Sequence, residues 1–219
     1  MAGLLALARR LPQTLPRQER REWLPNDLTG QASPWLIAGK TMGIIGLGTL
    51  GQAIAIRAKA FGMRVIGIRR QPDRDVPIGV DQNVPRIDVH RMLEEADVVV
   101  LAAPWTPGTN QILDSAAIGK MKPGAVVINV ARGQLVDESA LEEALTSGRL
   151  GGAVLDVFTN EPLPPDSAFW SMPNVIITPH TSGFRTDHFD AVVNLFSENL
   201  QRFERNADLL NVVDVEAGY

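Results

Sequence analysis

The sequence contains no cysteine and few histidines, and both shortages narrow the chemistry available to it. Without cysteine, neither a disulfide nor a thiolate metal site can form, and the composition fits a reducing cytoplasm. Only 3 histidines occur among 219 residues, and no clustered spacing of histidines and acids is present. We therefore expect no metal site.

Long basic runs and long apolar runs are also lacking. The formal net charge of −4 argues against a generic nucleic-acid binder. No apolar run reaches the length that spans a bilayer, and the short apolar run at the start precedes its arginines, the reverse of a signal peptide. The sequence therefore predicts a soluble cytoplasmic protein that binds neither membrane nor nucleic acid. Its 45% hydrophobic content is sufficient for a sizeable core.

The most informative feature that the chain does have is a glycine-rich turn, Gly46-x-Gly48-x-x-Gly51. It follows an apolar run at 41–46 and precedes an amphipathic helix pattern and a second apolar run at 64–68. This layout of strand, turn, helix and strand is typical of dinucleotide binding, because glycines let the backbone approach a pyrophosphate at a helix N-terminus. The alternative is a glycine-rich turn without a ligand.

Apolar runs and helix patterns alternate from residue 40 onward. Runs that predict buried strands cover residues 41–46, 64–68, 98–101, 125–130, 152–156 and 174–178. Helix patterns cover residues 50–61, 87–95, 114–119, 137–147 and 186–204. Strands that alternate with helices predict an α/β fold, here a Rossmann-type doubly wound parallel sheet in three layers, α/β/α.

We predict a single NAD(P)-binding domain over 1–219, with a Rossmann core at 40–184 and a C-terminal helix and tail at 185–219. Residues 1–39 comprise the end of a helix, at 2–11, and a stretch rich in proline, arginine and tryptophan with no clear period. An arm that packs on a second subunit through Trp23 and Trp35 would explain this stretch and predicts a homodimer. A loosely ordered tail is the alternative.

The end of the second predicted strand bears on the choice of cofactor. Ligands of such sheets lie outside the carboxyl ends of the strands, and an acid commonly binds the ribose 2′-hydroxyl of NAD at this point. Arg69 and Arg70 stand there instead, which favours the 2′-phosphate of NADP. NAD stays possible if these arginines are only solvated surface residues.

Polar residues also follow the last three predicted strands. Arg132, whose guanidinium could hold a carboxylate, follows the fourth strand, Asp156 follows the fifth and His180 follows the sixth. Each could singly be an ordinary surface or turn residue, but together they suggest a reacting end, separate from the adenosine end at Arg69. Further predicted cofactor contacts at the strand ends are Ala103, Pro104, Val130, Ala131, Ser182 and Gly183.

The motifs GLGTLG, NVARGQLVDESAL, LDVFTNEPLP and ITPHTSG resemble, in order and spacing, those of the D-isomer-specific 2-hydroxyacid dehydrogenases. The resemblance implies an enzyme acting on CH–OH donors, with hydride transfer between a nicotinamide and C2 of a small 2-oxo or 2-hydroxy acid. The branch that reduces glyoxylate and hydroxypyruvate with NADPH is suggested by the two arginines; a phosphoglycerate dehydrogenase-like member is the other reading.

The resemblance also implies residue roles. Arg132 would bind the substrate carboxylate and polarise the carbonyl, and His180 would be the general acid in reduction and the base in oxidation. Glu161 would hold and tune His180. Asp156 and His180 would also contact the nicotinamide end of the cofactor. The pyrophosphate would meet the backbone N–H groups of Thr49 and Leu50.

The resemblance further implies an additional amino-terminal domain of about a hundred residues, which would form the other wall of the cleft. Three hypotheses follow for the chain as given. It could be an active dehydrogenase, helped by a separate chain that supplies that domain. It could be a dimerising dinucleotide-binding module without catalysis, or a truncated product that an upstream reading frame would reveal.

Overall fold

The computed structural model describes residues 1–23, 33–69 and 75–215. Arg70, one of the two arginines predicted to select NADP, lies outside these residues. The chain divides into two compact units, Met1–Pro179 and His180–Tyr219, and each is described by itself. The single domain predicted over 1–219, with divisions at 39/40 and 184/185, stays a prediction.

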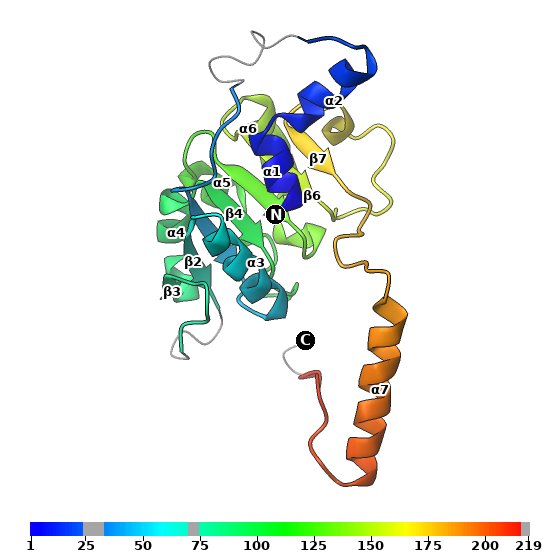
Figure 1. Ribbon diagram of the computed structural model, residues 1–219. Helices are drawn as coiled ribbons and strands as arrows, with labels where there is room; N and C mark the ends of the chain where they lie inside the picture. The colour runs from blue at the N-terminus through cyan, green and yellow to red at the C-terminus, as the bar shows by residue number, and fades with distance from the viewer. Residues whose placement is uncertain (24–32, 70–74, 216–219) are drawn as a thin grey trace. The chain divides into compact units, whose positions relative to one another are not determined.

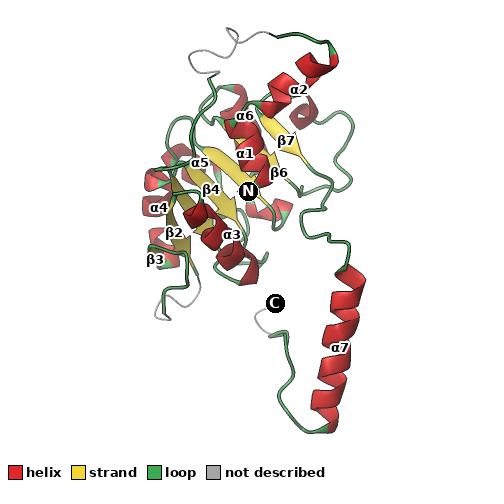
Figure 2. Ribbon diagram, viewed as in Figure 1, coloured by secondary structure: helices red, strands yellow, loops and turns green. Residues whose placement is uncertain are grey.

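The described part of the first unit forms a seven-stranded, all-parallel sheet with the order β3-β2-β1-β4-β5-β6-β7 (Figures 1 and 2). The strands β1, β4, β5 and β6 are buried throughout because helices cover both faces of the sheet, which explains why they read as continuous apolar runs, whereas the edge strands β3 and β7 are only partly buried. The strands are β1 (Thr41–Ile45), β2 (Arg64–Ile68), β3 (Gln82–Val84), β4 (Val98–Leu101), β5 (Val126–Asn129), β6 (Gly152–Leu155) and β7 (Val175–Ile177).

Two apolar clusters, one on each face of the sheet, make up the core. One cluster joins the strands to α1 (Ala2–Ala8) and α3 (Thr49–Ala60), and the other joins them to the helices α4 (Val89–Glu95), α5 (Ser115–Lys120) and α6 (Glu138–Thr146). Short 3₁₀ turns lie at Arg86–Asp88, Gly133–Leu135 and Ala168–Ser171. The predicted three-layer Rossmann-type fold is therefore confirmed.

Residues with strong boundary preferences stand at both ends of α6. The carboxylate of Asp137 caps the helix by accepting the N–H of Ala140 at 3.1 Å. Gly148 follows the last turn with φ of +73°, a left-handed conformation that favours glycine after a helix. The predicted strands all occur within two residues of their expected bounds, whereas β3 was not predicted because it is only three residues long and mostly polar.

The predicted irregular stretch at 12–39 was wrong in its first part, because α2 (Leu11–Glu19) is a helix. It begins after Arg10, whose φ of +58° turns the chain away from α1, and it contains Pro16. Trp35 packs, partly buried, against its own chain's core and donates its backbone N–H to Ala8, and its predicted role as an anchor for a second subunit stays a prediction. Trp23, by contrast, is 92% exposed.

The face that α3 buries also differs from the sequence pattern. The sequence pattern places Leu50, Ile54, Ala58 and Phe61 on one face; Ala58 is buried, but Leu50 and Phe61 are 46% and 45% exposed. The helix packs through Gly51, Ala55 and Ala58, which are buried. Small residues let the helix axis lie close to the sheet, which a count of apolar side chains does not reveal.

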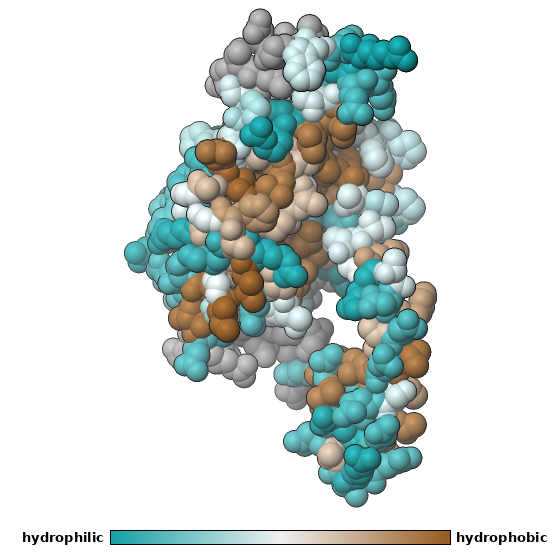
Figure 3. All heavy atoms as spheres, in the orientation of Figure 1, coloured by the Kyte–Doolittle hydropathy of each residue, from teal (hydrophilic) through white to brown (hydrophobic). Residues whose placement is uncertain are grey.

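The second unit is built around α7 (His188–Glu204). The helix matches the predicted range of 186–204, but none of its residues is buried. Figure 3 shows apolar side chains along it, and they include Phe189, Val192, Phe196, Leu200 and Phe203.

Candidate functional site

The sheet order places a topological switch point between β1 and β4. From β1 the chain proceeds outward through β2 and β3, and it then returns to β4 and proceeds to the other edge. Ile45 and Leu101, the last residues of these two strands, are paired in the parallel ladder. In doubly wound sheets the ligand crevice lies outside the carboxyl ends of the strands at such a point.

The predicted glycine turn starts at this switch point. Gly46 has φ of +102°, and a Cβ on it would lie 2.6 Å from the backbone nitrogen of Ala103. Its own N–H donates to the carbonyl of Ile68, at the end of β2, at 2.9 Å. Only glycine fits this position, because both the left-handed φ and the close approach of the β4 exit exclude a side chain.

The other two glycines have the properties that a pyrophosphate requires. Gly48 is the N-cap of α3, with no heavy atom within 4 Å of its Cβ position and no side chain capping the helix. Space and the first N–H groups of α3, including those of Thr49 and Leu50, are thus available to an anion. A Cβ on Gly51 would lie 1.9 Å from the carbonyl oxygen of Gly46, so helix and turn touch. These residues fit a dinucleotide.

Sequence reasoning missed Gln52 as a part of this turn. Its side-chain amide donates to the carbonyl of Leu47 at 2.9 Å and braces the turn from the first turn of α3. No motif pointed to it, because glutamine is common on helix surfaces.

Arg69 lies directly after β2, as the sequence predicted. Its Nη2 donates to the backbone carbonyl of Asp75 at 2.8 Å, which ties the guanidinium to the segment that follows. Its neighbour Ile68 accepts the N–H of Gly46. Arg69 therefore follows the strand residue to which the glycine turn is hydrogen-bonded.

The turn after β5 is held by a buried side chain that sequence reasoning did not single out. Asn129 is 1% exposed. Its Nδ2 donates to the carbonyl of Arg132 at 2.8 Å, and its Oδ1 accepts the N–H of Ala131 at 3.1 Å. Arg132 itself is exposed, and its Nη1 donates to the carbonyl of Ala131 at 2.6 Å. The turn through Val130 and Ala131 thus presents a guanidinium at the carboxyl edge of the sheet.

Two predicted acids follow β6. Asp156 is 2% exposed, and its Oδ1 accepts the hydroxyl of Thr178, which follows β7. Glu161 is exposed, and its Oε1 accepts the N–H of Phe158 at 2.9 Å, which closes a tight loop on itself. Thr178 was missed by sequence reasoning, since only the pairing of β6 with β7 brings it to Asp156.

Pro104, predicted as a cofactor contact, lies exposed shortly after β4, and the predicted residues His180, Ser182 and Gly183 belong to the second unit. His180 is the first residue of that unit and has φ of +54°, a conformation that a histidine adopts less readily than a glycine. Its pairing with Glu161 stays a prediction, as do the cofactor roles of Ser182 and Gly183.

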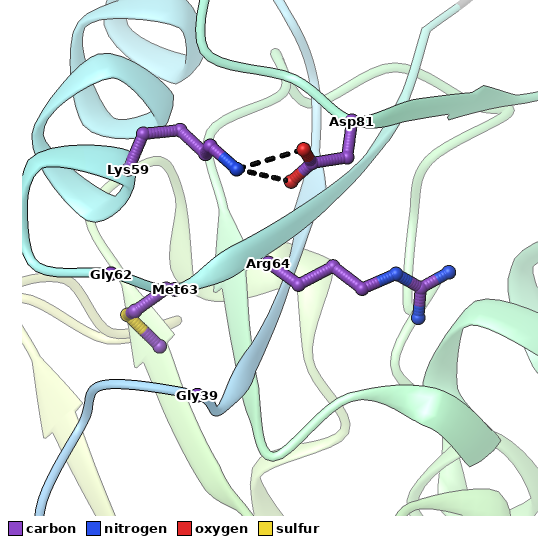
Figure 4. Close-up of a pocket in the computed structure, with 6 residues that line it drawn as sticks. All are labelled: Gly39, Lys59, Gly62, Met63, Arg64 and Asp81. Atoms are coloured by element: carbon purple, nitrogen blue, oxygen red, sulfur yellow. Dashed lines mark hydrogen bonds and ion pairs between the residues drawn. The ribbon is translucent and has the colours of Figure 1, made fainter.

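A pocket of about 350 Å³ lies at the opposite, amino-terminal end of β1 and β2 (Figure 4). Its cations are already paired: Lys59 donates to both carboxylate oxygens of Asp81 at 2.8 and 3.0 Å, and Arg64 donates to Glu95 at 2.7 Å. These contacts lower the pKa of the Asp81 carboxyl, mainly through Lys59 and then through the N–H of Val65. These two ion pairs therefore join α3 to the start of β3 and β2 to α4 at the amino edge of the sheet.

Within the described residues, no group of three or more histidines and acids is arranged to hold a metal ion. The same residues contain no helix that is long and apolar enough to cross a membrane.

Known proteins resemble this chain over almost its whole length. Residues 1–182 match the family model of the D-isomer specific 2-hydroxyacid dehydrogenase NAD-binding domain. The D-3-phosphoglycerate dehydrogenase of Methanocaldococcus jannaschii is 36% identical over 98% of this chain and 40% of its own length. The glyoxylate reductase of Korarchaeum cryptofilum is 37% identical over 82% of this chain and 54% of its own length. The chain therefore spans about half the length of these two relatives.

Solved structures give the same result. The NADPH-dependent glyoxylate/hydroxypyruvate reductase of Sinorhizobium meliloti, in complex with NADP and sulfate, has a TM-score of 0.87 and 35% identity and covers 100% of this chain and 67% of its own. The D-isomer specific 2-hydroxyacid dehydrogenase of Xanthobacter autotrophicus, in complex with NADPH and MES, has a TM-score of 0.84 and 34% identity. The match covers 99% of this chain and 85% of that protein's chain. The chain belongs to the D-isomer-specific 2-hydroxyacid dehydrogenase family and carries its NAD-binding domain.

Proposed function

We propose that this chain is the nucleotide-binding and proton-transferring part of an NADP-dependent reductase of small 2-oxo acids, of the glyoxylate or hydroxypyruvate type. One observation carries the proposal: an exposed guanidinium, that of Arg132, follows β5 on the same sheet whose switch point fits a dinucleotide. The reductases named among its relatives and structural neighbours support the choice of substrate class.

Each predicted catalytic residue has a distinct task in this proposal. Arg132 binds the substrate carboxylate through its planar fork and polarises the neighbouring carbonyl. His180 donates a proton to the carbonyl oxygen during reduction and takes it back during oxidation. Glu161 orients His180 and favours its protonated form. The bound dinucleotide would supply the hydride that C2 receives.

Turnover by the purified chain tests the catalytic part of the proposal. With NADPH and glyoxylate or hydroxypyruvate, we expect cofactor oxidation that falls by about 10²- to 10⁴-fold in His180→Ala, because a general acid contributes that much. Arg132→Lys should raise KM for the 2-oxo acid, since a lysine cannot form the bidentate pair. Oxidation at the same rate in wild type and His180→Ala would refute the role of the histidine.

The preference for NADP rests on Arg69, because Arg70 lies outside the described residues. We expect Arg69→Ala to weaken NADPH binding by about tenfold, as for a lost charge-assisted hydrogen bond, and to leave NADH binding unchanged. Arg91→Ala is a matched control, because Arg91 lies on α4, which packs on the face of the sheet opposite to α3 and the glycine turn. Tighter binding of NADH than NADPH by the wild type, unaltered in Arg69→Ala, would contradict the preference.

A second candidate function is a homodimeric dinucleotide-binding module without catalysis. The 92% exposed Trp23, on a segment that follows α2, favours it, because a large apolar side chain in that position is suited to a partner surface. Cofactor binding without turnover would support this candidate. A monomer in sedimentation, unchanged in Trp23→Ala, would remove its dimeric part. The cytoplasmic location stays a prediction.

A further inference from the structure

The loop that carries Glu161 is tied down by a second acid from another element. The backbone N–H of Thr159 donates to Oε1 of Glu138 at 2.6 Å. Glu138 is the first residue of α6 and lies 21 positions earlier in the chain. One residue before Thr159, the N–H of Phe158 donates to Glu161. Two successive N–H groups of the loop are therefore held by carboxylates.

The same loop lies directly against the turn that carries Arg132. A Cβ on Gly133 would lie 2.0 Å from the carbonyl carbon of Phe158 and 2.2 Å from the nitrogen of Thr159. Backbone therefore meets backbone at this point, and only glycine permits it. The segment 132–138 therefore carries the guanidinium of Arg132 and also contacts the Glu161 loop twice, through Gly133 and through Glu138.

A helix-capping role does not account for Glu138. The N-cap of α6 is Asp137, whose carboxylate already accepts the N–H of Ala140. An acid in the first turn is favoured by the helix dipole without any partner, so the dipole does not explain why this carboxylate reaches Thr159. A hydrogen bond from a backbone N–H to a carboxylate is stronger than one to a neutral acceptor. Glu138 is thus suited to fixing a loop in place.

We infer that Glu138 is a positioning residue, which holds the Glu161 loop at a fixed distance from Arg132. The inference rests on the proposed function, because that distance matters only if both residues serve one substrate. A small displacement of either group from its working geometry is costly to a reaction that depends on orientation. Removal of the Glu138 carboxylate should therefore lower kcat and leave nucleotide binding, at the switch point, unaffected.

Three variants of α6 test the inference. Glu138→Ala removes the acceptor, Glu138→Gln keeps an acceptor oxygen without the charge, and Glu143→Ala removes an exposed acid of the same helix. Amide hydrogen exchange of Thr159 should accelerate about tenfold in Glu138→Ala, be largely restored in Glu138→Gln and stay at the wild-type rate in Glu143→Ala. In glyoxylate reduction, kcat should follow the same order while the Kd for NADPH stays constant.

The two measurements separate this inference from the proposed function. Wild-type protein that does not reduce glyoxylate contradicts the proposed function, and the exchange of Thr159 still decides whether Glu138 holds the loop. Unchanged exchange in Glu138→Ala overturns the inference. So does faster exchange with an unchanged kcat, since the loop would then be held for stability alone. A Glu138→Gln variant that restores slow exchange of Thr159 but not kcat would show that the charge acts otherwise than by holding the loop, and would also overturn it.

Discussion

Two glycines in helices predict opposite outcomes for the same substitution. A Cβ on Gly51, in α3, would lie 1.9 Å from the carbonyl oxygen of Gly46, whereas real Cβ contacts essentially never fall under 3.0 Å. The obstacle is backbone, so it cannot rotate away, and the helix must move by at least about 1 Å. Gly119, in α5, has no heavy atom within 4 Å of its Cβ position.

The magnitudes follow from two opposing effects. Overpacking against a backbone atom destabilises by about 3 kcal/mol, at the upper end of the usual range, and replacing a helical glycine with alanine stabilises by about 1 kcal/mol. Gly51→Ala should therefore lose about 2 kcal/mol of unfolding free energy, and Gly119→Ala should gain about 0.5–1 kcal/mol. For a domain of this size the first corresponds to a fall in Tm of about 4–8 °C.

Urea and thermal unfolding of the two variants measure these differences, and titration with NADPH measures the consequence for the site. Because Gly51 joins α3 to the glycine turn, Gly51→Ala should also weaken NADPH binding, whereas Gly119→Ala should not. A Gly51→Ala variant as stable as wild type would refute the reasoning. Destabilisation by Gly119→Ala would show that the free space around its Cβ position does not govern the result.

Three further predictions concern stability. Leu4→Ala should cost about 2–5 kcal/mol in urea unfolding, because Leu4 is 0% exposed in the cluster that joins α1 to the sheet. Asp137→Ala should cost about 1 kcal/mol by the same assay, through loss of the N-cap to Ala140, and an unchanged midpoint would argue against the cap. Asp81→Asn should reduce stability at neutral pH by no more than about 1 kcal/mol, because Asp81 and Lys59 are partly exposed. Lys59 lowers the folded-state pKa of Asp81 below its ordinary value of 3.8, so the contribution of Asp81 to stability is present above that pH and is lost as pH falls through the folded pKa. The difference between Asp81→Asn and wild type should thus shrink on acidification, and a difference that grows would contradict the assignment.

Local sequence patterns were sufficient to predict most of the secondary structure of the first unit. Buried parallel strands are apolar throughout, and the glycine turn has fixed spacing, so both can be read from neighbouring residues. The exceptions have local causes as well. The three residues of β3 are too short and polar to form a pattern, and α2 contains prolines that obscure its helical character. The buried face of α3 was predicted only in part, because close packing selected small residues, and of these the pattern included Ala58 alone.

The sequence by itself determined the family, the dinucleotide turn and the residues that end the strands, because each depends on residue types at short spacings. Only the tertiary structure decided which side chains hold those residues in place. Asn129 grips the Arg132 turn, Thr178 donates to Asp156, and Glu138 reaches Thr159 across 21 positions. The last two contacts join segments that are distant along the chain, and all three side chains are of types that are common at surfaces and turns. Their roles exist only once the sheet has brought its strand ends to one edge.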